Sequence, residues 1–142
     1  MNNIKVSENF TMREYESPDT GEVKIHEDLA RLNQAVREEL DTPLIINSAY
    51  RTKEHNEEVG SKETSQHRNG NAADISTRKG RYTERQLPFH GLTSKELSEI
   101  YKDKANELNI GEKNLGLGFA NTFLHVDVRG VEGYPSPARW NY

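Results

Sequence analysis

One series of apolar residues repeats at helical spacing in the first third of the chain. The intervals are three, four and four residues, at Leu29, Leu32, Val36 and Leu40. This spacing places the four side chains on one face of a helix and predicts an amphipathic helix from about 27 to 40. Upstream, Thr11-Met-Arg-Glu14 has the hydroxyl and glutamate spacing of a capping box, so we expect a short helical turn near residues 11 to 15.

A second helical series follows another capping box, Thr93-Ser-Lys-Glu96. Its apolar members recur at helical spacing and stop before a glycine, at Leu97, Ile100, Tyr101, Ala105 and Leu108. The pattern predicts a helix that ends at Gly111. Thr52 is placed to cap a shorter helix that runs through Val59 and stops at Gly60.

Strands are predicted in four places. Residues 115–119 and 123–128 alternate with period two on either side of a three-residue link, which indicates an antiparallel hairpin. The β-branched run 43–48 predicts a strand that is buried for most of its length, and 72–76 predicts another.

The segments between these elements are polar and aperiodic. We interpret residues 61–71 as a loop that returns to the sheet and residues 77–91 as a long surface loop or insertion. The tail from Tyr134 to Trp140 is expected to cross the surface as irregular chain, with Trp140 covering the end of the core or bordering a groove.

Length and composition limit the classes of protein. The 142 residues suit a single domain, 1–142, and the net charge of −4 provides no basic stripe for nucleic acid. The chain has no cysteine, so a transition metal would have to be held by histidine and carboxylate. We find no signal-peptide pattern and no apolar run of bilayer length, so the chain is expected to stay in the compartment of its synthesis, away from membranes.

A polar set shares one face of the predicted last strand. Successive side chains of a strand point to opposite faces, so His125, Asp127 and Arg129 lie together. The core-facing positions are Leu124, Val126 and Val128. A face of this kind suits the wall of a site.

The partner strand has glycine on the same face, at Gly116 and Gly118. A glycine in a strand interior often marks a place where another backbone or a ligand comes close. We therefore expect these two positions to give a substrate access to the site.

His67, Asp74 and His125 form a candidate metal site. Catalytic zinc usually takes three protein ligands of this kind and keeps one position for water, whose pKa it lowers to about 7. Gly70 would let the chain turn between the first two ligands, and the other two stand in predicted strands, which hold ligands rigidly.

Three segments resemble the zinc D-Ala-D-Ala carboxypeptidase family of peptidoglycan peptidases. They are Ile46-Asn-Ser-Ala-Tyr-Arg51, Ser65-Gln-His-Arg-Asn-Gly-Asn-Ala-Ala-Asp-Ile75 and Phe123-Leu-His-Val-Asp-Val-Arg129. The resemblance implies an α+β fold, shared with the hedgehog signalling domain, in which helices pack on an antiparallel sheet. It also implies zinc (Zn²⁺) as cofactor, held by His67, Asp74 and His125, with Arg51 beside the metal to bind a carbonyl or carboxylate of the substrate.

The sequence departs from the family pattern at Thr122. Several branches of the family have a catalytic Glu or Asp three residues before the last histidine ligand, and this chain has none there. Asp127 is the best local candidate for the general base, about 7 Å from His125 along the strand. It is equally suited to orienting His125 or neutralising Arg51.

Two functions follow from the resemblance. The first is a monomeric zinc metallopeptidase that cuts a stem peptide of bacterial peptidoglycan, either as a D-Ala-D-Ala carboxypeptidase or as an endopeptidase of the endolysin type. Because no secretion signal or wall-binding module is visible, we expect a phage lysin, released to the cell wall or carried in the virion, rather than a secreted enzyme. The alternative is a zinc-stabilised binding or virion structural module without turnover, which the missing acid at position 122 motivates.

Overall fold

The structure is a computed structural model that describes residues 2–78 and 88–142. Residues 79–87, the centre of the predicted loop 77–91, lie outside the described part, and the flanks of that loop contain neither helix nor strand. Within the described ranges, no helix combines the length and the apolar character that crossing a bilayer requires.

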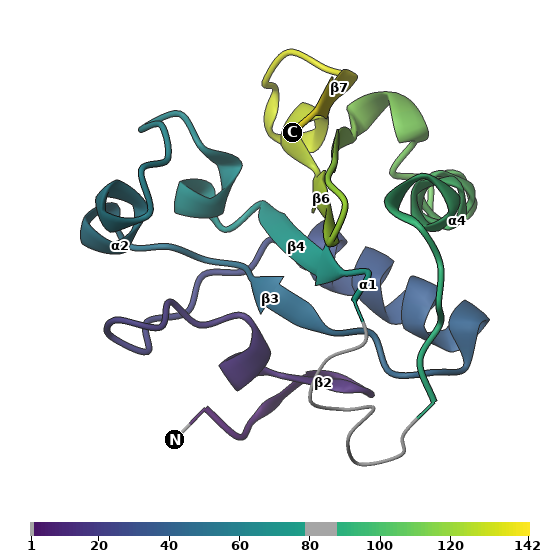
Figure 1. The fold of residues 1–142 in the computed structure, drawn as a ribbon, viewed down its shortest axis with the longest axis horizontal. Coiled ribbons are helices and arrows are strands. Elements are labelled where there is room, and N and C mark those ends of the chain that lie inside the picture. The colour runs from purple at the N-terminus through teal and green to yellow at the C-terminus, as the bar shows by residue number, and fades with distance from the viewer. Residues whose placement is uncertain (1, 79–87) are drawn as a thin grey trace.

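A five-stranded sheet forms the centre of the fold, in the order β3-β4-β6-β5-β7 (Figure 1). In chain order the strands are β3 (Ile46–Ser48), β4 (Ala72–Ser76), β5 (Gly116–Phe119), β6 (Phe123–Asp127) and β7 (Ala138–Asn141). All neighbouring pairs are antiparallel except β5 and β7, which run parallel. The predicted α+β class is confirmed: helices pack on a sheet that is antiparallel, as expected, except for the β5–β7 pair.

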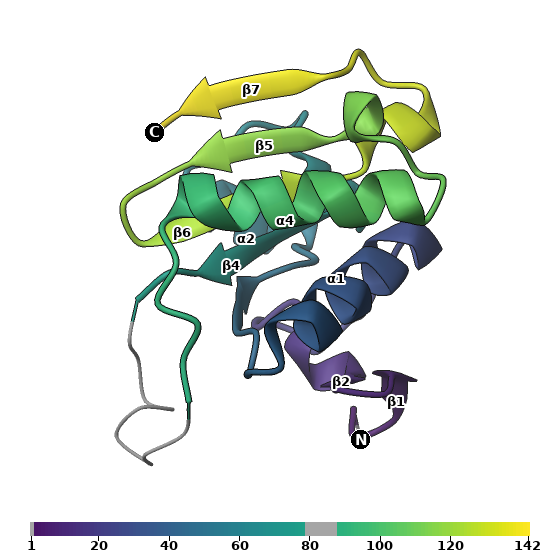
Figure 2. The same ribbon diagram turned by 90° about the vertical axis from the view of Figure 1, so that its right-hand side faces the viewer.

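Helices α1 (Glu27–Leu40) and α4 (Ser94–Glu107) cover one face of this sheet (Figure 2). The short helix α2 (Lys53–Glu58) and the 3-10 turn η2 (Gln66–Asn69) lie on the other side. The remaining elements are β1 (Lys5–Ser7), β2 (Phe10–Thr11) and the 3-10 turns η1 (Met12–Glu14), η3 (Glu112–Asn114) and η4 (Arg129–Glu132). The three predicted helices and the capped turn are thereby confirmed, although α4 ends at Glu107, before the stop predicted at Gly111.

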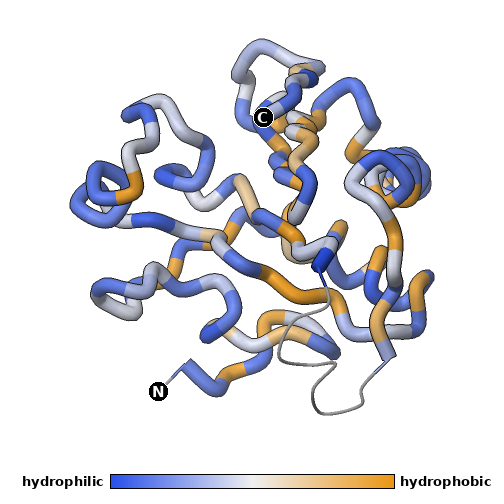
Figure 3. The backbone as a smooth tube through the Cα atoms, viewed as in Figure 1, coloured by the Kyte–Doolittle hydropathy of each residue, from blue (hydrophilic) through white to orange (hydrophobic). Residues whose placement is uncertain are grey.

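The core lies between the sheet and the two long helices. The apolar stripe of each helix and the apolar positions of β5 and β6 form one buried cluster that includes Leu29, Leu32, Val36, Leu97, Tyr101, Leu117, Leu124 and Val126. Figure 3 shows the corresponding alternation of hydrophobic and hydrophilic residues along the helices. The alternation predicted for the last strand is confirmed.

One polar group bridges two tyrosines inside this core. The Asn33 side chain donates to the Tyr15 hydroxyl at 3.0 Å and accepts from the Tyr101 hydroxyl at 2.7 Å. Burial raises the pKa of both phenols. The three side chains tie α1 to α4 and to the segment after η1, so this pairing fixes which helix faces meet.

Two strand predictions need correction. Residues 43–48 were expected to form a mostly buried strand, but β3 comprises three residues, of which Asn47 is exposed and the other two are half-buried. β3 is partly exposed because it is an edge strand, with a neighbouring strand, β4, on one side only. The tail was expected to be irregular, yet Ala138–Asn141 pairs with β5 as a strand.

Candidate metal centre

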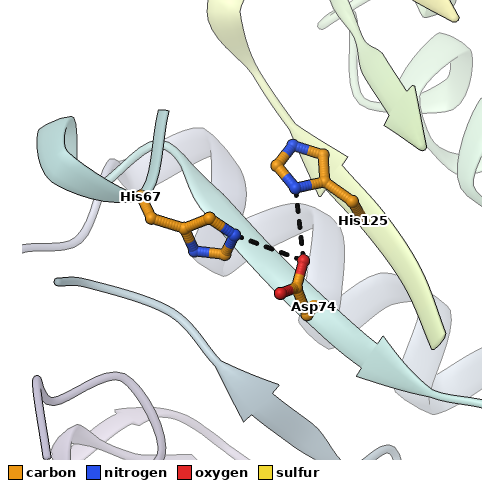
Figure 4. A group of neighbouring side chains, drawn as sticks. All are labelled: His67, Asp74 and His125. Carbon is orange, nitrogen blue, oxygen red and sulfur yellow. Dashed lines mark hydrogen bonds and ion pairs between the residues drawn. The ribbon is translucent and has the colours of Figure 1, made fainter. Parts of the chain in front are cut away.

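Three side chains from separate elements converge at one point. His67 comes from η2, Asp74 from β4 and His125 from β6, and one ligand atom of each lies within 4.8 Å of the others (Figure 4). Asp74 and His125 are directly opposite in the antiparallel register, so their side chains leave the sheet on the same face. The predicted trio is therefore assembled as a group that could hold a metal ion.

A tight turn presents His67 to this point. The Ser65 hydroxyl accepts a hydrogen bond from the His67 amide at 3.3 Å, and Gly70 closes the turn with φ of 74°. A Cβ on Gly70 would lie 2.6 Å from the carbonyl oxygen of Lys24. Position 70 therefore needs glycine for its backbone angle and for the close passage of a neighbouring segment, as the predicted turn required.

Each histidine directs one nitrogen at Asp74. His67 Nε2 and His125 Nδ1 each lie 3.2 Å from Asp74 Oδ1. The opposite nitrogen of His67, Nδ1, is 2.6 Å from the carbonyl oxygen of Ala49, which can only accept. In its neutral form, His67 would therefore carry its proton on Nδ1 and turn the Nε2 lone pair inward.

His125 uses the reverse arrangement. Its Nε2 lies 2.7 Å from Asp127 Oδ2, an acceptor, so the neutral ring would carry its proton on Nε2 and turn the Nδ1 lone pair toward Asp74. Two imidazole lone pairs and one carboxylate oxygen then surround a single point. This donor set suits zinc, which takes nitrogen and oxygen ligands in protein sites of this kind.

The electrostatics of the buried group also suit a cation. Burial would raise the pKa of Asp74, but the neighbouring imidazoles of His125 and His67, which donate to this carboxylate when both of their nitrogens are protonated, outweigh burial and hold that pKa well below its usual range. Burial lowers the pKa of His67. For His125 burial acts in the same direction, but the hydrogen bonds with Asp127 and Asp74 prevail and its pKa is raised. A metal ion would take the place of a proton between the histidines and Asp74.

Asp127 is occupied on both oxygens. Oδ2 accepts from His125 and from Arg129 Nη2 at 2.8 Å, while Oδ1 accepts from the Arg129 amide at 3.0 Å and from its Nε at 2.9 Å. The residue is fully buried. Of the two roles expected for Asp127, this geometry favours orienting His125 over accepting a proton from water. The cation that it neutralises is Arg129, whereas Arg51 pairs with Asp74.

Arg51 lies beside the candidate ligands, as predicted. Its Nη2 is 3.5 Å from Asp74 Oδ2, and its Nε donates to the Ser48 hydroxyl at 3.1 Å. Its backbone amide donates to the carbonyl of His67 at 3.1 Å, which couples the arginine to the turn that carries the ligand. The guanidinium lines the same cleft as the three ligand side chains.

A cleft of about 630 Å³ opens over the three ligand side chains. Residues 59–62 and 64–66 line part of it, and the aromatic side chains of Phe123, Trp140 and Tyr142 line another part. Within the described residues that line it, Asp74 is the one carboxylate. Trp140 borders this cleft, which is one of the two positions expected for it. Phe123, Tyr142 and Lys62 were not identified from the sequence as lining residues, because β7 was not predicted and a lysine in a loop carries no pattern.

The expected role of Gly116 and Gly118 is wrong. A Cβ on Gly116 would lie against Asp127 Oδ2 and 2.6 Å from Arg129 Nε, and a Cβ on Gly118 would lie 2.6 Å from the Trp140 ring. The space above both glycines is filled by side chains of the chain itself. The glycines did signal a close approach, but the approaching groups are protein side chains and not a substrate.

Comparison with known proteins agrees with the geometry. The sequence profile described as Peptidase M15 matches residues 6–127, which include all three candidate ligands and Arg51. No curated protein matches the chain. Because the profile covers most of the sequence, the chain belongs to the peptidase M15 family of zinc metallopeptidases.

Proposed function

We propose that the chain is a zinc metallopeptidase that hydrolyses a peptide bond in the stem peptides of bacterial peptidoglycan. One observation carries the proposal: in a member of the peptidase M15 family, His67, Asp74 and His125 converge at the floor of an open cleft. These three residues would hold the zinc ion. When bound, zinc supplies a Lewis acid that polarises a carbonyl and makes water nucleophilic near neutral pH.

The charges of the cleft support a substrate with free carboxylates. Arg51 and Lys62 line it, together with Arg129, whose charge is balanced by Asp127. The one lining carboxylate of the cleft among the described residues, Asp74, would be neutralised by a metal. This local excess of positive charge contrasts with the net charge of −4 of the whole chain. Stem peptides carry carboxylates at their D-Glu residue and at their D-Ala terminus, so they suit such a cleft.

Arg51 is assigned to substrate binding. Its Nε is held by Ser48 and one Nη by Asp74, so the planar guanidinium has a fixed direction at the edge of the ligand group. An arginine fixed in this way can bind a carbonyl or carboxylate of the substrate next to the reacting bond. Asp127 is assigned to holding His125 in the tautomer and orientation that ligation needs, and not to proton transfer.

A second candidate function is a zinc-binding module of the same fold without turnover. The observation that favours it is the lack of a second carboxylate among the described residues of the cleft, together with the exposed Thr122 where several family branches have an acid. In that case the metal would stabilise the fold and the cleft would bind wall peptide without cutting it.

One experiment separates the two. Bound zinc is measured in the purified protein, and peptidoglycan of several wall types is then incubated with the wild type and with His67→Ala, Arg51→Ala and Asp127→Ala. If the protein is a peptidase, the wild type should release new amino groups from at least one wall type. This release should be lost in His67→Ala and reduced in Arg51→Ala. Arg31→Ala, which removes an exposed ion pair on α1, is the matched control. Stoichiometric zinc with no release of amino groups from any wall type would establish the non-catalytic module.

A further inference from the structure

We infer that Arg129 and Trp140 are positioning residues for His125, members of a closed ring of contacts that the glycines at 116 and 118 make possible. This inference rests on the proposed zinc site. Both residues lie beyond position 127, where the match to the family ends. The segment after β6 would thus complete a metal centre whose ligands all lie in the matched part.

The first half of the ring runs through Asp127. This carboxylate bonds His125 Nε2 at 2.7 Å and accepts three hydrogen bonds from Arg129, one from the backbone and two from the guanidinium. A carboxylate held at two oxygens by a two-point arginine pair cannot rotate without breaking charged hydrogen bonds. Arg129 therefore fixes the group that fixes His125.

Trp140 closes the second half of the ring. The guanidinium carbon of Arg129 lies 5.1 Å from the centre of the Trp140 ring, within the range of a cation–π contact. The same ring lies 4.9 Å from the His125 ring. His125 is consequently held at its Nε2 edge by Asp127 and on another side by the indole, and the two restraints are joined through Arg129.

The sheet register explains how a residue of β7 reaches β6. Asp74, His125, Gly118 and Trp140 stand opposite one another on β4, β6, β5 and β7, in a single row across the sheet. Side chains of a row project from the same face. Because position 118 has no side chain, the indole lies over it, and a Cβ there would be only 2.6 Å from the ring.

Gly116 has the matching role two rows away. It stands opposite Asp127, and a Cβ at this position would collide with the Asp127 carboxylate and with Arg129 Nε. The two glycines of β5 therefore leave room for the two restraints on His125, one for each. Side chains at both positions of β5 would displace the Trp140 indole and the Asp127 carboxylate, and so remove both restraints on His125.

The inference predicts a graded loss of zinc affinity. Removal of the direct partner, Asp127→Ala, is expected to weaken zinc binding by about 10- to 100-fold, and Arg129→Ala and Trp140→Ala by about 3- to 10-fold each, because they act through a neighbour. Trp140→Phe keeps a ring and should stay near the wild-type affinity, while Arg129→Lys keeps the charge without the two-point pair and should fall between Arg129→Ala and the wild type.

The measurement is competition for zinc between the protein and a chelator of known affinity, with Arg31→Ala as control and thermal unfolding to confirm that each variant is folded. Trp140 is the single tryptophan, so its emission also reports zinc binding in the variants that retain it. Wild-type zinc affinity in both Arg129→Ala and Trp140→Ala would overturn the inference. Because this readout needs no turnover, reduced zinc affinity in these variants supports the inference even if peptidoglycan is never cut.

A double-mutant cycle tests the glycine. Gly118→Ala should weaken zinc binding in the wild-type background, because the new methyl group pushes the indole away from His125. In the Trp140→Ala background the same change should have little effect, since no ring remains to be displaced. Equal losses of zinc affinity in the two backgrounds would mean that the methyl group acts through the backbone of β5, which would overturn this part of the inference.

Discussion

Neighbouring residues of β6 point to opposite faces of one sheet, and the two faces differ in chemistry. Leu124 and Val126 point into the apolar core under α1 and α4, whereas His125 and Asp127 point into the candidate metal centre. Both sets are almost fully buried: none of these four residues is more than 4% exposed. Depth of burial therefore does not distinguish the faces; the chemistry of the buried groups does.

The core face is stabilised by the removal of apolar surface from water, which requires shape but no specific partner. On the site face every buried charge has an opposite charge or a hydrogen-bond partner, because an unpaired buried charge would be very costly. The core face should therefore determine whether the chain folds, and the site face whether the folded chain binds metal. Substitutions on the two faces should separate these properties.

Adjacent substitutions in β6 should give the largest contrast. His125→Ala removes a candidate ligand and is expected to abolish zinc binding and to lower peptidase activity by roughly 10³-fold or more, while the protein stays folded. Leu124→Ala should cost about 2–5 kcal/mol of unfolding free energy, and the part that remains folded should bind zinc normally. Zinc titration and urea unfolding of the two variants measure both effects. Retained zinc stoichiometry in His125→Ala would show that His125 is not a zinc ligand.

Removal of metal should affect stability through the site face alone. At a free zinc concentration 100 times its dissociation constant, the ion should stabilise the folded state by about 2.7 kcal/mol. Addition of chelator should therefore lower the melting temperature of the wild type, and re-addition of zinc should restore it. In His125→Ala the chelator should have no effect, so an equal shift in that variant would place the stabilising ion elsewhere.

Substitution of Asn33, the buried polar bridge of the core, should lower stability without changing zinc affinity. Asn33→Ala leaves the hydroxyls of Tyr15 and Tyr101 without this shared partner inside the core, and should destabilise the fold by about 2 kcal/mol. Zinc affinity of the folded variant should equal that of the wild type. Urea unfolding and chelator competition provide the two measurements, and a coupled loss of zinc affinity would show that the two faces are not independent.

High pH should weaken the core through the same tyrosines. Burial raises the pKa of Tyr101 and Tyr15 above the ordinary value near 10, so the folded state binds these protons more tightly than the unfolded state. Their contribution to stability is complete below about pH 10 and is lost above it, by up to about 1.4 kcal/mol per pH unit for each tyrosine. Urea midpoints between pH 8 and 11 measure this slope. It should be shallower in Tyr101→Phe.

A helix cap on the core side should have the smallest effect. The Thr93 hydroxyl accepts a hydrogen bond from the Glu96 amide at 3.1 Å at the start of α4. Thr93→Ala should cost about 1 kcal/mol of stability, and Thr93→Ser should restore most of it. Thermal unfolding measures the loss. Because α4 packs on the core face, zinc affinity is expected to stay at the wild-type value.

Local patterns predicted most of the elements. The apolar stripes of α1 and α4, the capping boxes at Thr11 and Thr93 and the alternation in β6 are properties of a few neighbouring residues, and each corresponds to an observed element. The predictions that failed depended on distant pairing. Whether residues 138–141 form a strand depends on the free edge of β5, which no local pattern reveals.

The sequence by itself determined the donor chemistry: no cysteine, two histidines and an aspartate at spacings that resemble one family, and a strand whose alternation separates the core from the site. The tertiary structure alone decided which nitrogen of each histidine faces the candidate metal centre, which side chains Asp127 is hydrogen-bonded to, and which side chains fill the space over Gly116 and Gly118. The physical reason is that side-chain type and spacing are local, whereas tautomers, charge pairs and occupied volume depend on which strands become neighbours.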